Sequence, residues 1–313
     1  GQAGALSMSL LVITSIGVFL HSRFSRHAKS YQTVTGKGFR PRPMELGKLR
    51  WPATLLILGY FLIGVVMPVF ILVYSSTQNF YQVPSMETLS NMTLDNYRYT
   101  FSQDQTLRAL KNSFALGIGS ATGVMLLMAV GSWLVVRTRI PGRWMVDNLA
   151  FLPLVVPGLV LGVSMLFVYL RHPLPVYGTI WILLIAYFTR YMPYGMRYAS
   201  TSMYQIGAEL EECAETCGAS WWQSFRRVLL PLLAPGLVAG WIYIITVSVR
   251  ELSSSILLYS PGNEVFSIVI WEQWNNGQYT ELASLGVVMV SALVLLVVVA
   301  RKLGATIGVR EAG

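Results

Sequence analysis

This 313-residue sequence contains little cysteine and little charge. Its two cysteines, Cys213 and Cys217, are too few for a disulfide framework, and their spacing is not that of a zinc site. We expect both to be small residues on the apolar face of a helix. Charged residues make up only 12% of the chain, against about a quarter in soluble domains. The composition therefore excludes an ordinary soluble domain.

The motifs of several enzyme classes are also missing. The sequence contains no G-x4-G-K-[ST] loop for ATP phosphates, no H-E-x-x-H zinc motif and no G-x-S-x-G nucleophile motif. Its three histidines, His21, His27 and His172, are scattered and lack the paired spacing of metal ligands. We therefore expect no catalytic residue, no metal site and no cofactor bound by this chain.

Long apolar segments dominate what is present. Hydrophobic residues make up 54% of the chain, and a helix needs about twenty of them in succession to cross a bilayer. The sequence therefore predicts an all-α membrane protein. The segments that reach this length are 3–20, 52–75, 107–136, 146–170, 179–199, 236–259 and 282–300.

Basic residues gather in alternate connections between these segments. Most of the 23 Lys and Arg residues lie in 21–51, in 137–143, in and just before 203–235, and in the tail 301–313. Lys and Arg are enriched on the cytoplasmic side of membrane proteins, so we place these connections in the cytoplasm and residues 76–106 and 260–280 outside. The same clustering explains the net charge of +9 without any nucleic-acid partner.

Residues 203–235 form the longest break in the apolar pattern of the second half. Apolar positions at helical spacing predict an amphipathic helix from Met203 to Cys217, and Gly218 suits the left-handed residue that ends a helix. Ser220 and Gln223 then have the spacing of a capping box, which predicts a second helix up to Pro231.

The same stretch resembles the EAA motif of membrane-spanning permease subunits of type I binding-protein-dependent ABC importers. That motif reads E-A-A-x3-G-x9-I-x-L-P, and Cys213 and Val228 are the two departures from it here. We call residues 203–235 the EAA-like loop. The positions that align with the motif, including these two departures, are Glu212, Cys213, Ala214, Gly218, Val228, Leu230 and Pro231.

The resemblance implies a bundle of six spans at 52–300 whose EAA-like loop is cytoplasmic and couples transport to a separate ATPase. It further implies two ATP-binding cassette subunits that carry ATP and Mg, a periplasmic substrate-binding protein, a second permease half and surrounding membrane lipid. The location implied is the bacterial inner membrane. The residues expected to contact the ATPase subunit are Glu211, Glu212, Ala214, Gly218, Val228, Leu230 and Pro231.

The N-terminal part of the chain resembles the ferric-iron branch of these importers. Segment 1–20 is expected to be the last span of an upstream half, joined by the basic linker 21–51 to the six spans, as in the C-terminal half of a fused permease. Ferric iron is therefore the first choice of cargo. Thiamine, an aminophosphonate or another small anion remains open.

Three charged residues fall inside predicted spans. Each of Arg190, Arg250 and Glu251 is expected to cost about 2.5–3.5 kcal/mol on insertion scales, so they should face the bundle interior. They would line a translocation pathway or gate, or Glu251 would form a structural ion pair with one of the arginines. Two other classes remain open, an ion-coupled secondary carrier and a purely structural membrane subunit.

Overall fold

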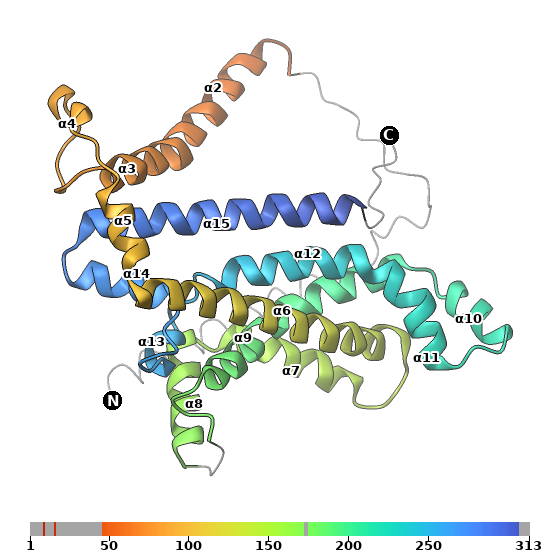
Figure 1. Cartoon of the computed structure of the whole chain (residues 1–313). Coiled ribbons are helices and arrows are strands. Elements are labelled where there is room, and N and C mark those ends of the chain that lie inside the picture. Colours follow the sequence, from red (N-terminus) through yellow and green to blue (C-terminus); the bar gives the residue numbers. More distant parts are fainter. Residues whose placement is uncertain (1–8, 10–15, 17–45, 172–174, 307–313) are drawn as a thin grey trace. The chain divides into compact units, whose positions relative to one another are not determined.

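The structure, a computed structural model, describes residues 46–171 and 175–306 together with Ser9 and Ile16 (Figure 1). Most of the predicted span at 3–20 and of the linker at 21–51 therefore lies outside the described residues. Within the described ranges all regular secondary structure is helical, which confirms the all-α class. The chain divides into two units, residues 1–97 with 279–287 and residues 98–278 with 288–313, and each is described by itself.

The first unit is built on one long apolar helix. After a short turn, η2 (Gly47–Leu49), the helix runs without a break through the three elements given below, and most of its side chains up to Val73 are exposed. Only Tyr74, Ser75 and Ser76 at its end are buried. The bare apolar surface is typical of a helix that faces lipid or another helix. The three elements are α2 (Arg50–Phe61), the π-helical η3 (Leu62–Val66) and α3 (Met67–Ser76).

Two further elements complete this unit. The short helix α4 (Met86–Ser90) follows a loop after α3, and α15 (Tyr279–Thr306) begins here before it continues in the second unit. The helix α5 (Asp95–Ser102) connects the two units along the chain.

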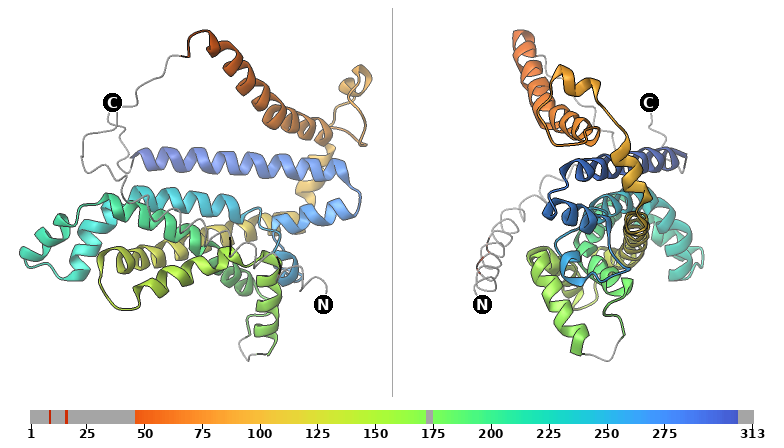
Figure 2. Two further views of the ribbon diagram at one scale, coloured as in Figure 1. Left: turned by 180° about the vertical axis from the view of Figure 1, so that it is seen from behind. Right: turned by 60° about the vertical axis from the view of Figure 1, so that its left-hand side comes forward.

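The second unit is organised around three long helices that pack against one another (Figure 2). Its core consists of apolar side chains from all three, among them the fully buried Val124, Ile182, Met196 and Ile244. The helices are α6 (Asp104–Arg137), α9 (Ile180–Gln205) and α12 (Leu230–Ser248).

Glycines allow these helices to approach closely. A Cβ atom at Gly195 of α9 would lie 2.5 Å from Val124 Cγ1 of α6, and one at Gly117 of α6 would lie 2.8 Å from Ser248 Oγ of α12. Both distances are too short for a real contact. Small residues at such crossings are typical of helix packing within membranes.

Four of the described helical stretches are long and apolar enough to cross a membrane. They correspond to the predicted segments at 52–75, 107–136, 236–259 and 282–300, although their ends differ. The stretches are Gly47–Ser76, Asp104–Arg137, Trp221–Ser248 and Tyr279–Ala300.

The two other predicted spans within the described residues look different. The segment at 146–170 is a bent pair, α7 (Arg143–Val155) and α8 (Gly158–Arg171), whose axes differ by 107°. Pro157 lies in the break, where its missing N–H favours interruption of the helix. The segment at 179–199 begins at Thr179, the N-cap of α9, and otherwise lies within this helix, which is long enough but too polar for the same criterion.

The prediction for 236–259 was wrong at both ends, and so was the predicted stop at Pro231. The helix begins at Trp221, runs through α11 (Trp221–Ser224) and the π-helical η4 (Phe225–Leu229), and ends with α12 at Ser248. Pro231 lies in the first turn of α12, directly after the wider π turn, which accommodates a residue without an N–H. The EAA-like loop therefore continues directly into a membrane-length helix.

Candidate functional site

The first helix of the EAA-like loop is shorter than predicted. Instead of one helix from Met203 to Cys217, α9 ends at Gln205 and α10 (Glu209–Thr216) begins after an interruption. Ile206 adopts an extended conformation (ψ 128°), which breaks the helical hydrogen-bond ladder. This break separates α10 from the long helix α9 that precedes it.

Gly218 ends α10 as predicted. Its φ of +85° lies in the left-handed region, and no atom lies near the position of a Cβ there, so backbone conformation alone favours glycine. The Gly218 N–H donates to Glu215 O (2.9 Å), and the Ala219 N–H donates to Ala214 O (3.0 Å). These two bonds form a Schellman motif, in which the carbonyl of Ala214 is satisfied.

The second helix begins with the predicted capping box. The Ser220 N–H donates to Gln223 Oε1 (2.8 Å), and the Gln223 N–H donates to Ser220 Oγ (3.4 Å). Trp221 then packs against Trp133 of α6, with ring centroids 4.9 Å apart, and stacks on Phe225 at 5.5 Å. Local polar contacts thus start the helix, and aromatic contacts fix its position against α6.

Glu211 attaches α10 to the end of α6. Glu211 Oε1 lies 2.8 Å from Arg137 Nε, and Glu211 Oε2 accepts a hydrogen bond from Trp133 Nε1 at 3.1 Å. Arg137 also donates through Nη2 to the carbonyls of Met203 and Ile206, where α9 ends. The side chains of Glu211 and Arg137 are only 16% and 14% exposed. The largely buried ion pair therefore joins α6 to α10, and the other hydrogen bonds of Arg137 add the end of α9.

The other residues expected to contact the ATPase subunit differ in their exposure. Glu212 and Pro231 are exposed, whereas Ala214, Val228 and Leu230 are half-buried. The adjacent glutamates thus differ in their contacts, since Glu211 is held inside the chain and Glu212 is accessible from outside.

The expectation for the cysteines was wrong. Both Cys213 and Cys217 are exposed free thiols on and just after α10. Because α10 is short and separated from α9, the face that the sequence pattern assigns to a core has few side chains packed against it.

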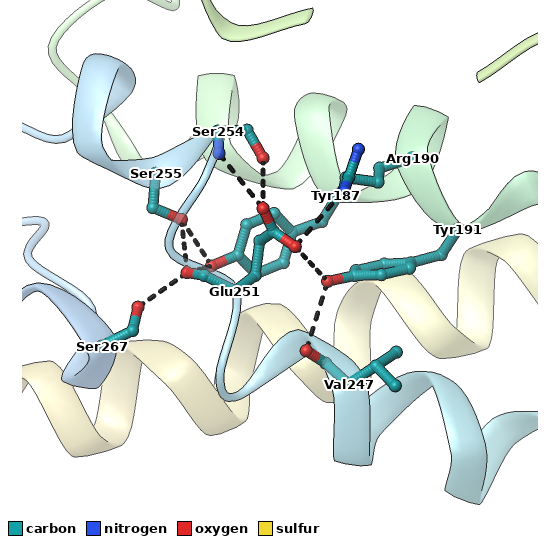
Figure 3. Close-up of polar contacts among 8 residues, drawn as sticks. All are labelled: Tyr187, Arg190, Tyr191, Val247, Glu251, Ser254, Ser255 and Ser267. Carbon is teal, nitrogen blue, oxygen red and sulfur yellow. Dashed lines mark hydrogen bonds and ion pairs between the residues drawn. The ribbon is translucent and has the colours of Figure 1, made fainter. Parts of the chain in front are cut away.

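A second polar cluster surrounds Glu251 (Figure 3). Glu251 Oε2 lies 3.3 Å from Arg190 Nε and accepts a hydrogen bond from Tyr191 Oη at 3.2 Å. Glu251 Oε1 accepts from the N–H and the hydroxyl of Ser254 at 3.1 and 3.0 Å. Both carboxylate oxygens therefore have partners, which compensates for the burial of the charge.

The backbone carbonyl of the same residue is also a hydrogen-bond centre. Glu251 O accepts from the hydroxyls of Ser267 (2.6 Å), Ser255 (3.0 Å) and Tyr187 (3.4 Å). Through these bonds Glu251 connects α9 with α13 (Ser255–Leu258) and α14 (Phe266–Asn275). The cluster fixes the turn at which the chain leaves α12.

Of the two arginines considered for this pair, Arg190 contacts Glu251. Arg250 is exposed and forms no ion pair among the described residues. The expectation that Arg250 and Glu251 lie in the middle of a span was wrong, because α12 ends at Ser248 and both residues belong to the turn that follows. Arg190 lies within α9, as predicted.

Sequence reasoning missed several contributors to these clusters. Trp133 and Arg137 are four residues apart near the end of an apolar helix, so they share one face, and this spacing is a usable signal. Tyr187, Arg190 and Tyr191 have the same helical spacing in α9, which indicates a polar stripe within an apolar segment.

Comparison with known proteins gives a family match. Residues 123–307 match the family described as "Binding-protein-dependent transport system inner membrane component". This range includes the C-terminal part of α6 from residue 123, the EAA-like loop and the Glu251 cluster.

Two curated relatives and one solved structure illustrate the similarity. The chain is 29% identical over 198 residues to the putative 2-aminoethylphosphonate transport system permease protein PhnV of Salmonella paratyphi A, covering 61% of this chain and 74% of that protein. It is 27% identical over 282 residues to the Fe(3+)-transport system permease protein FbpB 2 of Haemophilus influenzae, covering 88% of this chain. The chain spans only 52% of that relative's length.

The fold is similar to that of a chain in the crystal structure of a bacterial alginate ABC transporter in complex with an alginate pentasaccharide-bound periplasmic protein. The TM-score is 0.65 at 17% identity, and the match covers 83% of this chain and 94% of that chain.

Proposed function

Because the chain belongs to the family of inner membrane components of binding-protein-dependent transport systems, we propose that it forms the membrane pathway of an ATP-driven importer of ferric iron. The observation that carries the importer assignment is the family match, which includes the whole helix-turn-helix of the EAA-like loop. The chain is a permease subunit, and ATP hydrolysis with its Mg belongs to two separate ATP-binding cassette subunits.

The EAA-like loop is the part that receives work from the ATPase. Glu212 is exposed on α10, where a partner can contact it, while Glu211 is bound to Arg137 and keeps α10 attached to α6 and α9. A force on α10 therefore reaches two long helices through one ion pair and reaches α12 through the continuous helix that starts at Trp221. This arrangement requires that the loop be on the cytoplasmic side.

Arg190 and Glu251 act in the pathway as a gate. The Arg190 side chain reaches from the polar stripe of α9 to Glu251 in the turn after α12, and it is 26% exposed. It is therefore partly accessible while its Nε atom is bound to the carboxylate. Loss of this pair would weaken the attachment of the turn to α9, where Tyr187 and Tyr191 remain as partners of Glu251.

Ferric iron is proposed as cargo because the similarity to the ferric permease extends over 88% of this chain, whereas that to the aminophosphonate permease extends over 61%. The second relative makes 2-aminoethylphosphonate the alternative. A periplasmic binding protein and a second permease half, fused or separate, complete the importer.

Uptake assays test both parts of the proposal. Cells that lack the protein should lose ATP-dependent accumulation of radioactive iron and regain it when the gene is restored. Restored uptake of 2-aminoethylphosphonate instead would overturn the cargo but retain the importer. Uptake by the purified chain in proteoliposomes, driven by an ion gradient without ATPase subunits, would overturn the importer itself.

A further inference from the structure

The loop between α3 and α4, residues 77–85, and the first residue of α4, Met86, expose large apolar side chains. Phe80, Val83 and Met86 are 79%, 82% and 89% exposed, and Tyr81 is also exposed. The sequence contains no charged residue between Arg50 and Glu87, so this loop is as neutral as the helix that precedes it. A neutral loop of exposed apolar residues is unusual at a surface that faces only water.

Hydrogen bonds hold both ends of this loop at the end of α3. Asn96 Nδ2 donates to Ser76 O (2.9 Å) and to Gln78 O (2.8 Å), and the Thr93 N–H donates to Thr77 O (2.8 Å). Further along, the Tyr74 hydroxyl donates to Thr88 Oγ1 at 2.8 Å. The apolar tip of the loop therefore cannot move far from the end of the helix.

The loop also shares a cavity with the last turns of α3. A cavity of about 150 Å³ separates Ile71, Tyr74 and Ser75 of α3 from loop residues 81–84, and all of them line it. Since the helix rises 1.5 Å per residue, the α3 residues that line the cavity lie within about 8 Å of the helix end, so the loop faces the last turns of α3.

The depth of the helix end follows from its length. Residues 51–74 carry no charge and span about 36 Å, against about 30 Å for the hydrocarbon core of a bilayer. The end of α3 therefore lies in the headgroup region, and so does the loop beside it. Tyr81 also packs on Tyr279, with ring centroids 5.9 Å apart, where a second membrane-length helix begins. Tyrosines at such positions are typical of the membrane interface.

We propose that residues 77–86 are inserted in the lipid headgroup layer, where Phe80, Tyr81, Val83 and Met86 contact lipid at the boundary with the acyl chains. The occupant of this surface is membrane lipid. A protein that docks from outside would need side chains that project past the helix end, and the loop lacks charges that would guide such a partner. The inference depends only on α2 and α3 crossing the bilayer, not on the cargo or the ATPase.

Accessibility of spin labels tests the proposal. The native thiols are first removed by C213S and C217S, and a nitroxide is attached to the full chain in lipid nanodiscs through V83C. The matched control is N91C, an exposed polar position at the end of α4. The label at position 83 should collide with oxygen more often than with a water-soluble nickel chelate, and the ratio should exceed that at position 91 several-fold.

A label at a second position tests whether the result applies to the whole exposed tip of the loop. F80C should give the same lipid-type ratio as V83C, because both side chains belong to the same exposed tip. Equal nickel accessibility at positions 80, 83 and 91 would overturn the proposal. Nickel accessibility that disappears only when a periplasmic binding protein is added would also overturn it and would identify the loop as a protein contact.

Discussion

Arg137 Nε and Glu211 Oε1 lie 2.8 Å apart, and this ion pair joins the last turn of α6 to α10. Glu211 precedes Glu212, the glutamate that matches the EAA motif, yet only Glu211 is bound inside the chain. The proposed function thus assigns attachment of α10 to Glu211 and contact with a partner to the neighbouring Glu212.

Replacement of Glu211 by Gln should uncouple ATP hydrolysis from uptake. The substitution removes the charge while retaining the size of the side chain, and hydrogen bonds to charged groups contribute about 1.5–3 kcal/mol. Cargo transported per ATP hydrolysed should fall several-fold in proteoliposomes, although the ATPase subunits still bind. E215Q is the matched control, because Glu215 is exposed on the same helix. Equal transport ratios for both variants would contradict the role of the ion pair.

Gly218 offers a test of backbone conformation alone. G218V should abolish uptake, since a β-branched residue is strongly disfavoured at a φ of +85°. G218N should retain most of the uptake, because asparagine tolerates the left-handed region and no neighbouring atom obstructs its Cβ. Similar loss in both variants would show that the size of the residue matters rather than its conformation.

The Glu251 cluster should be essential for stability. Removal of one partner of a buried ion pair typically costs about 3–5 kcal/mol, and Arg190 is partly exposed, so E251Q should fall near the lower end of that range. Thermal unfolding in detergent measures the loss. R250Q is the control and should unfold at nearly the temperature of the parent protein, because Arg250 is exposed.

A charge exchange between Arg190 and Glu251 separates a gate from a structural lock. R190E combined with E251R should restore the stability lost in either single variant, because the pair can form again. If the pair is a gate, uptake should remain low in the double variant. Recovery of both properties would favour a purely structural role, and recovery of neither would exclude direct coupling between the two residues.

Packing between α6 and α9 can be tested at Gly195. G195A should lower the thermal midpoint, because the added Cβ would lie 2.5 Å from Val124 Cγ1 and the helices must separate. The control is G64A, at a position of η3 where no atom lies within 4 Å. That variant should be neutral or slightly stabilising, since alanine favours helix by about 1 kcal/mol relative to glycine. A smaller effect at Gly195 than at Gly64 would contradict the packing.

Local features were predictable from the sequence, and contacts between distant segments were not. Gly218 and the Ser220–Gln223 capping box depend on residues a few positions apart, so their spacing was sufficient. The ion pair between Arg137 and Glu211 depends on how α6 and α10 pack, which no spacing specifies.

The end of α12 illustrates the same limit. Apolar residues continue to Tyr259, so the pattern predicted one span to that point. The chain turns earlier because the Glu251 side chain accepts hydrogen bonds from Ser254 and from residues of α9, and these bonds exist only in the folded chain. Pro231 was misleading for a related reason, because the π turn before it accommodates the ring.

The unbroken helix from Trp221 to Ser248 has one mechanical consequence. Its 28 residues extend about 42 Å at 1.5 Å per residue, so a tilt or twist imposed beside Ser220 is carried to a point three residues before Glu251. The π-helical turn Phe225–Leu229 and the internal Pro235 are the points along this helix where its bend or winding can change.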